Sequence, residues 1–218
     1  AGIASIAAEE SVQDLMALTL ETGHIGGVPA DGPDFAHATN ADATLDPGYQ
    51  FDFYDGGGLD VAFLGLAQTD VQGNVNVSKF SGRPVGCGGF INITQNAKKV
   101  VFCGTFTASG LQVRAGNGRL EIVREGTSRK FLDQVEQITF SGHYAAGVGQ
   151  TVMYVTERAV FQLTREGGME LLEVAPGIDI ERDILAHMDF VPRMDKVRPM
   201  DTGIFDEQWG RLSAILHG

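Results

Sequence analysis

The sequence predicts an α/β fold: an open, mostly parallel sheet with flanking helices, joined by an antiparallel hairpin element. Strand-like apolar runs alternate with glycine turns and short helical stretches. The first three runs are almost entirely apolar, as in parallel strands covered on both faces. The later runs are joined by the short connections ERA and REGG, which favours hairpins. The predicted strands are residues 15–20, 60–66, 99–106, 120–123, 136–140, 151–156, 159–164 and 169–175.

Short helices are predicted around these strands. The chain begins with a helix-like stretch at residues 1–11, and a glycine pair opens a second helix at residues 88–99. A third helix, residues 176–188, starts with proline and glycine and has an acidic first turn. Residues 189 onward are expected to form an extended tail. Because there are no repeats or clear linkers, a single domain of residues 1–218 is predicted.

Composition narrows the possible partners. The net charge of −12 at pH 7 argues against nucleic acid and anionic membrane surfaces, which both require a basic footprint. No apolar run approaches the length of a membrane span, and the N-terminal stretch has no signal-peptide core. Two cysteines are too few for a disulfide scaffold, and the five histidines lack ligand spacing, so no metal is predicted. The sequence thus predicts a cytoplasmic protein.

One glutamate stands out at the end of the first predicted strand, in the stretch LTLETGHIGGVPADGP. Ligands of open parallel sheets gather where strands end, and Glu21 directly follows residues 15–20. The neighbouring glycines, among them Gly23, leave this carboxylate uncovered and permit close approach of a substrate. From the residues alone, Glu21 can cap a helix, hold a metal or do chemistry, and a cap is the commonest of these roles.

A second glycine-rich stretch, GRPVGCGGF, complements this carboxylate. Gly86, Gly88 and Gly89 precede the predicted helix of residues 88–99, so their N–H groups are expected to point outward, with the helix dipole behind them. Such groups bind an oxyanion or a phosphate. A carboxylate with an oxyanion hole suits a reaction in which the carboxylate itself attacks a carbonyl. Taken alone, however, a glycine cluster is more often a plain turn.

Other residues near these stretches have weaker interpretations. Gln68, near the end of the second predicted strand, is expected on the same rim and can contact substrate. Cys87 is interpreted as a small buried residue in preference to a nucleophile, since no basic partner is nearby in sequence. Asn74, after a glycine, is interpreted as a turn residue. His24 and His143 are lone histidines, and His143 is expected in a loop.

Several segments carry a family resemblance. ETGHIGGVPA, FDFYDGGGLDVAFLGLAQTDVQGNVNVSKF, GCGGFINITQNAKKVVFCGTFTASGL, VEQITF, TERAVFQLT and LLEVAPGIDIERDIL occur in this order along most of the chain. Together they resemble the C-terminal half of family I coenzyme A transferases, especially the single-chain acetate and short-chain acyl-CoA transferases. The resemblance implies a CoA-transferase-like fold.

The resemblance also implies a mechanism. The family's catalytic glutamate lies in an E-x-G motif, which corresponds to Glu21 in ETG. Gly23, Gln68 and Gly86 are expected to contact CoA or substrate. The family's oxyanion-hole glycine lies in a G-x-G-G segment, which corresponds to Gly86, Gly88 and Gly89, with Gly88 or Gly89 as the N–H donor. A ping-pong reaction with an acyl-CoA, a carboxylate acceptor and a glutamyl-CoA thioester follows. Coenzyme A is then a substrate, and no tightly bound cofactor is predicted.

Partners follow from the same resemblance. Family members bind CoA partly through an N-terminal half with its own glycine-rich loop, which is not found in this sequence. A chain cut inside the second half is therefore expected, paired with an N-terminal half or subunit that supplies cations. A homo-oligomer, tetrameric by family, is also implied. Two alternatives stay open: an acyl-CoA hydrolase on the same scaffold, and a non-catalytic module like sugar-phosphate sensors, against which the ETG and GCGG motifs count.

Overall fold

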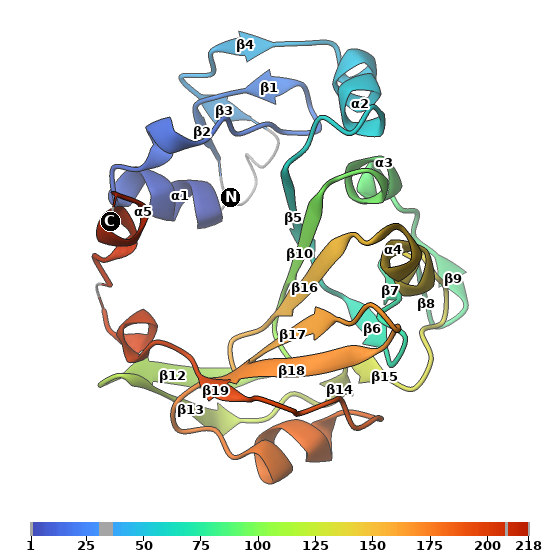
Figure 1. Cartoon of the computed structure of the whole chain (residues 1–218), viewed down its shortest axis with the longest axis vertical. Helices are drawn as coiled ribbons and strands as arrows, with labels where there is room; N and C mark the ends of the chain where they lie inside the picture. The colour runs from blue at the N-terminus through green and yellow to red at the C-terminus, as the bar shows by residue number, and fades with distance from the viewer. Residues whose placement is uncertain (1, 31–36, 208, 218) are drawn as a thin grey trace. The chain divides into compact units, whose positions relative to one another are not determined.

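The computed structural model describes residues 2–30, 37–207 and 209–217 (Figure 1). The chain divides into two compact units. The larger comprises Leu59–Glu207, and the smaller comprises Ala1–Gly58 with Gln208–Gly218. The expectation that the whole chain forms one domain stays a prediction.

A six-stranded mixed sheet organises the larger unit, in the order β19-β18-β17-β16-β10-β5. The strands β5, β10 and β16 run parallel, with Lys99 paired to both Val61 and Thr151. The strands β16, β17 and β18 are antiparallel, because short turns connect them. This arrangement confirms the predicted parallel sheet with an antiparallel element. The bounds are β5 Val61–Gly65, β10 Lys99–Cys103, β16 Thr151–Val155, β17 Ala159–Leu163, β18 Met169–Val174 and β19 Arg198–Pro199.

Aromatic side chains fill the core beneath this sheet. Phe102 of β10 is fully buried and stacks on Phe90, with ring centroids 5.6 Å apart. Its ring also meets Phe140 edge-on at 5.1 Å. Phe90 belongs to helix α3 (Phe90–Gln95), and helix α4 (Gly142–Val148) packs near β16. The alternation of buried and part-buried residues along β10 therefore anchors the flanking helices to the sheet.

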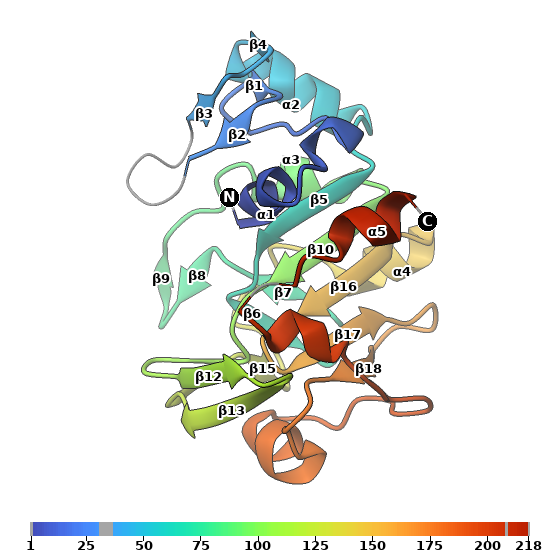
Figure 2. The same cartoon turned by 90° about the vertical axis from the view of Figure 1, so that its left-hand side faces the viewer.

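Smaller sheets surround this core. A three-stranded sheet has the order β15-β6-β7, and β12–β13 form a hairpin that projects from the larger unit (Figure 2). Most residues of β12 are exposed, whereas Leu120 of β13 is buried in a second apolar cluster with Val160 and Phe205. The bounds are β6 Gln68–Asp70, β7 Val75–Asn76, β8 Lys79–Phe80, β9 Arg83–Pro84, β11 Thr107–Ala108, β12 Gln112–Gly116, β13 Arg119–Arg124, β14 Ser128–Arg129 and β15 Phe131–Leu132.

Two predicted strands are wrong. The first is residues 15–20, where Leu15 is the last residue of a 3-10 helix, Gln13–Leu15. The only β contact in this segment is the bridge from Thr19 to Ile25. In residues 136–140 only Phe140 forms a bridge, to Val75, before Ser141 caps α4. Residues 15–20 are largely apolar and residues 136–140 contain only Ile138 and Phe140 as apolar residues, and in both segments the chain turns away before a ladder can form. An apolar run indicates that a segment is buried. A strand forms only where a second segment also provides backbone groups for hydrogen bonding.

Three helical expectations also need correction. The helix predicted at residues 88–99 is shorter, because α3 spans only Phe90–Gln95. Residues 176–188 form no α-helix but a π-helical turn, Ile180–Ile184, and a 3-10 turn, Leu185–His187. The tail after residue 189 is not simply extended, since it contains β19, a 3-10 helix at Thr202–Phe205 and helix α5, Leu212–His217. The side chain of Asp201 starts that 3-10 helix by accepting a hydrogen bond from the Gly203 N–H.

The smaller unit combines helices with two-stranded sheets. It contains the predicted first helix, α1 (Gly2–Glu9), and the helix α2 (Pro47–Asp55). The Asp46 side chain caps α2 by accepting a hydrogen bond from the Gly48 N–H, and Pro47 occupies the first helical position. The strand β1 (His24–Ile25) pairs with β4 (Ala43–Thr44), and β2 (Val28–Pro29) pairs with β3 (Ala38–Thr39).

A buried ion-pair cluster stabilises the larger unit. The Arg158 side chain has no exposed surface and donates to Glu125 at 2.7 and 3.1 Å and to Glu157 at 2.6 Å. It also donates to the Asp183 carbonyl at 2.9 Å. Burial by itself raises the pKa of the Glu125 carboxyl. Hydrogen bonds from Arg158 and Thr107, together with the charge of Arg158, lower this pKa by a larger amount. The net result is a pKa below the ordinary value of 4.5.

We expect this cluster to make folding sensitive to acid. A carboxyl whose pKa is lower in the folded state stabilises the fold above its unfolded pKa and loses that contribution as the pH falls through the folded value. The free energy of unfolding should therefore drop below about pH 4.5, measured by urea titration from pH 7 to pH 3. Glu125→Gln should flatten this drop, whereas Glu166→Gln, at a 75% exposed side chain, should not. A full acid response in Glu125→Gln would contradict the assignment.

Candidate active site

Glu21 lies in a tight turn of the smaller unit, just before β1. The Leu20 N–H donates to the His24 carbonyl at 2.9 Å, and the Gly23 N–H donates to the Leu20 carbonyl at 2.9 Å. The Gly26 N–H closes the base of the turn at the Leu18 carbonyl, 2.7 Å away. The Glu21 side chain is half-buried, and its carboxylate makes no hydrogen bond or ion pair with the described residues. It therefore does not cap a helix in that part of the chain.

Gly23 has a structural reason to be glycine. Its φ is +98°, and a Cβ at this position would lie 2.0 Å from the Leu45 carbonyl oxygen. The Leu45 N–H donates in return to the Gly23 carbonyl at 2.9 Å. The turn that carries Glu21 thus lies directly on the backbone that leads into α2. A contact between Gly23 and substrate stays a prediction.

The second glycine stretch lies in the larger unit, between β9 and α3. Gly86 and Gly88 have φ values of +86° and +52°, and a Cβ at either would meet no atom within 4 Å. The Gly86 N–H donates to the Ser78 carbonyl at 3.3 Å. By contrast, the N–H groups of Gly88 and Gly89 have no hydrogen-bond acceptor among the residues that the structure describes. Helix α3 has only six residues. The hydrogen-bond donors that this stretch offers to a ligand are therefore the N–H groups of Gly88 and Gly89 themselves.

A polar network holds this stretch from below. The Ser78 carbonyl also accepts from the Val85 N–H at 2.8 Å, while the Ser78 hydroxyl contacts the Thr139 hydroxyl at 2.7 Å. Gln137 donates to the Ser78 hydroxyl at 3.0 Å. Sequence reasoning missed Ser78, Thr139 and Gln137, because residues about 60 positions apart give no local signal.

Gln68 joins the same network through Asn76. The fully buried Asn76 donates to the Gln68 amide oxygen at 2.6 Å and accepts from the Ser78 N–H at 3.0 Å. Gln68, Gly86 and Ser78 are therefore linked within the larger unit by hydrogen bonds. The Gln68 amide oxygen thus accepts one hydrogen bond and keeps a second lone pair, and a contact between Gln68 and substrate stays a prediction.

Other residues resolve as packing or turn elements. Asn74 is confirmed as a turn residue, since its N–H and its amide nitrogen both donate to Asp70, each at 3.1 Å. Cys87 is half-buried and packs against the main core, which supports its interpretation as a packing residue. His24 contacts the Thr44 hydroxyl at 3.1 Å. His143, expected in a loop, instead belongs to α4, because Ser141 caps that helix by accepting from the Tyr144 N–H.

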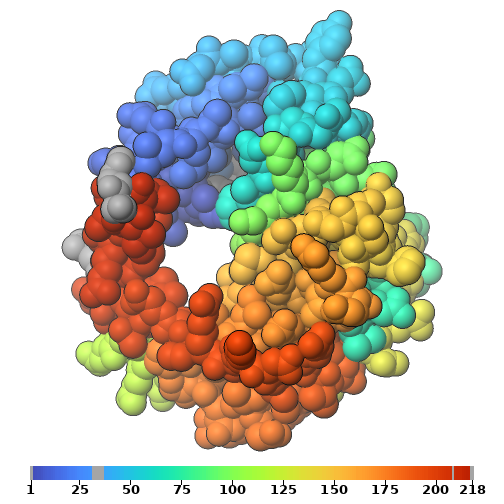
Figure 3. Space-filling model, viewed as in Figure 1, coloured from blue at the N-terminus to red at the C-terminus, as the bar shows by residue number. Residues whose placement is uncertain are grey.

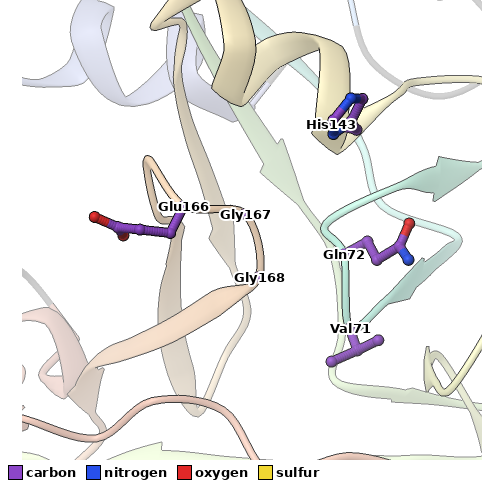
Figure 4. A pocket seen from close by; sticks show the side chains of 6 residues that line it. All are labelled: Val71, Gln72, His143, Glu166, Gly167 and Gly168. Carbon is purple, nitrogen blue, oxygen red and sulfur yellow. The ribbon is translucent and has the colours of Figure 1, made fainter.

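A surface cavity of about 370 Å³ lies elsewhere in the larger unit. It is lined by parts of the β6–β7 turn, α4 and the β17–β18 turn, and the last two adjoin at the surface in Figure 3. Figure 4 shows that the Glu166 and Gln72 side chains point away from each other. Glu166 instead pairs with Arg193 at 3.5 Å. These polar groups do not converge, so the cavity offers no arrangement for catalysis.

Two further features bear on ligand classes. Within the described ranges, no group of three or more histidine, cysteine, aspartate or glutamate side chains is arranged to hold a metal ion. Likewise, no helix in the described part of the chain is long and apolar enough to cross a membrane.

Comparisons with known proteins identify the relatives of this chain. No protein-family model matches it. It is 50% identical over 220 residues to caffeate CoA-transferase of Acetobacterium woodii, covering 98% of this chain and 42% of that protein. It is 48% identical over 205 residues to acetate CoA-transferase YdiF of Escherichia coli O157:H7, covering 94% of this chain and 38% of that protein.

The solved structures agree with the sequence comparison. The apoenzyme of the acyl-CoA transferase YdiF from Escherichia coli O157:H7 matches with a TM-score of 0.90 at 45% identity, over 96% of this chain and 40% of that one. A thioester complex of YdiF with CoA matches with a TM-score of 0.89 at 46% identity, with the same coverage. The chain spans about two-fifths of the length of these relatives. By sequence over most of its length and by fold, the chain is therefore similar to CoA-transferases.

Proposed function

We propose that this chain carries the nucleophile of an acyl-CoA:carboxylate CoA transferase, and that Glu21 is that nucleophile. The observation that carries the proposal is the Glu21 carboxylate itself, which is half-buried, fixed on a tight turn and without a partner among the described residues. A carboxylate left unpaired in a position that partly desolvates it is free to attack. The surrounding chain is about half identical to CoA-transferases, which supports the same chemistry.

The reaction proceeds by two exchanges at carbonyl carbons. A Glu21 carboxylate oxygen attacks the thioester carbonyl, the carbon–sulfur bond breaks, and CoA leaves as a thiolate from a mixed anhydride. The thiolate attacks the glutamyl carbonyl and releases the first carboxylate, which leaves Glu21 as a CoA thioester. An acceptor carboxylate then reverses both steps, so a new acyl-CoA departs and Glu21 is restored. No net proton is consumed. The published YdiF complex is itself described as a thioester with CoA.

The glycine stretch supplies hydrogen-bond donors for this chemistry. We assign oxyanion stabilisation to the N–H groups of Gly88 and Gly89, since fixed donors are worth most where negative charge develops. The Gly86 N–H is already bonded to Ser78, so Gly86 shapes the stretch and does not donate. Gln68 and Gly23 are assigned to the surroundings of bound CoA. These roles rest on the family motifs together with the unpaired N–H groups.

The rest of the enzyme is proposed to come from a second CoA-transferase half, on the same polypeptide or another. The relatives are more than twice as long as this chain, which leaves room for such a half. Coenzyme A carries several phosphate charges, and a chain of net charge −12 needs cations from elsewhere to bind them. We further propose short-chain acyl substrates, a cytoplasmic location and a homo-oligomeric assembly.

Acceptor dependence tests this function. In the complete enzyme, acyl-CoA should be consumed beyond a single turnover only when a carboxylate acceptor such as acetate is added, with one new acyl-CoA formed for each one lost in the steady state. Hydroxylamine or borohydride added with acyl-CoA should modify Glu21, detected by mass spectrometry of the peptide. If the thioester disappears equally fast without an acceptor, the protein is a hydrolase. Absence of any turnover or label would support a binding module.

A further inference from the structure

A chain of polar side chains, buried at Gln50 and Tyr54 and half-buried at Thr19, connects helix α2 to the turn that carries Glu21. The Gln50 amide nitrogen donates to the Tyr54 hydroxyl at 2.8 Å, and that hydroxyl donates to the Thr19 hydroxyl oxygen at 2.9 Å. Gln50 is completely buried and Tyr54 is 2% exposed. Both lie on α2, one helical turn apart, so their side chains meet on the same helix face.

This polar chain lowers the stability of the smaller unit relative to apolar packing. The Gln50 amide oxygen is buried and has no hydrogen-bond partner among the described residues. An orphaned buried acceptor costs stability, and an apolar pair of similar shape would avoid that cost. Hydrogen bonds, however, fix direction and register, whereas apolar contacts allow neighbouring elements to slide. The polar chain therefore fits a demand for defined geometry between α2 and Thr19 better than a demand for stability.

Thr19 connects the polar side chains of α2 to the turn that carries Glu21. It lies two residues before Glu21 and bridges to Ile25 across the turn. The opposite side of the turn is held by the Leu45 N–H, which donates to the Gly23 carbonyl at 2.9 Å just before α2 begins. The turn is thus attached on both sides to one stretch of chain, Leu45 to Tyr54. A shift of α2 would move the backbone of Glu21 with it.

We propose that Gln50, Tyr54 and Thr19 are positioning residues that set the attack geometry of Glu21. This inference rests on the proposed function of Glu21 as the nucleophile. An attacking carboxylate must be held close to the carbonyl carbon, and a misplacement of about 1 Å can cost roughly 100-fold in rate. The Tyr54 hydroxyl is central, because it accepts from Gln50 and donates to Thr19. The three side chains act through the backbone of the turn.

Matched variants of the complete enzyme test the inference. Tyr54→Phe removes the central hydroxyl, and Tyr49→Phe makes the same change on the same helix at a residue that is 71% exposed. Thr19→Val removes the acceptor, whereas Thr19→Ser keeps it. Tyr54→Phe and Thr19→Val should each lower kcat and the single-turnover rate of Glu21 labelling about tenfold or more, with KM changed less than twofold. Tyr49→Phe and Thr19→Ser should stay within about twofold of the unaltered enzyme.

The outcomes separate this inference from the proposed function. Equal labelling rates in Tyr54→Phe and Tyr49→Phe, or equal losses in Thr19→Ser and Thr19→Val, overturn the inference and leave the transferase intact. A loss confined to KM overturns it as well. If Tyr54→Phe does not fold, the Thr19 pair decides. Absence of label on Glu21 in the unaltered enzyme overturns the proposed function, and the inference with it.

A second readout does not depend on catalysis. Amide hydrogen exchange at Leu20 and Gly23, whose N–H groups close the turn, should accelerate in Tyr54→Phe relative to Tyr49→Phe. Unchanged exchange at both amides would show that the hydroxyl does not hold the turn, and would overturn the inference.

Discussion

Glu21→Gln is expected to reduce CoA transfer by roughly 10³-fold or more, because it removes the carboxylate that forms the covalent intermediate. Glutamine has almost the same shape, so the turn closed by Leu20 and Gly23 should remain intact. The loss should therefore appear in kcat, with KM for acyl-CoA little changed. Steady-state rates of acyl-CoA formation from a donor and a carboxylate acceptor measure it.

The control for this variant lies in the same unit. Glu9→Gln makes the same chemical change at an exposed residue of α1 and should leave kcat unaltered. Hydroxylamine trapping should label the Glu9→Gln enzyme at Glu21 and leave the Glu21→Gln enzyme unlabelled. If Glu21→Gln keeps more than about a tenth of the activity, the covalent route through this residue is wrong.

Arg158→Met should have the largest effect on stability, lowering the free energy of unfolding by about 3–5 kcal/mol. The Arg158 side chain is fully buried, and its removal leaves Glu125 and Glu157 without their cation and the Asp183 carbonyl without this donor. Unpaired charges held in the interior cost far more than the pair itself contributes. Urea-induced unfolding at pH 7 measures the change.

Arg114→Met is the matched control for this prediction. Arg114 pairs with Glu121 at 3.3 Å, but its side chain is 71% exposed. Exposed ion pairs contribute about 0–1 kcal/mol, so its loss should be several-fold smaller. Equal destabilisation by the two substitutions would show that burial of Arg158 does not set its importance.

The main features of the sheet could be predicted because each has a local cause. Continuous apolar runs produced the parallel strands β5 and β10, and turns of a few residues produced the hairpins of β16, β17 and β18. Residues 15–20 carry a similar apolar signal and residues 136–140 a weaker one, but neither segment forms a full strand. In both, the chain turns away before a partner strand is reached, at Glu21 and at Ser141 respectively. Pairing depends on distant backbone, which a local pattern does not contain.

The candidate site shows the same division. Glu21 and the glycines of GCGGF were singled out from short motifs and from the family resemblance, and their roles stay predictions. Those motifs did not indicate which N–H groups are free to bind a ligand and which are used in hydrogen bonds within the chain. Gly86 is bonded to Ser78, whereas Gly88 and Gly89 keep unpaired N–H groups in the described structure.

The hydrogen bonds that hold these two stretches in place could not be predicted from sequence patterns. Tyr54 and Thr19 are 35 positions apart, and Ser78 and Thr139 are 61 positions apart. The linear chain thus indicated the candidate reactive groups, since residue type and local spacing are what a motif contains. Their anchoring emerged from folding, because a hydrogen bond between distant residues depends on where the backbone has carried both partners.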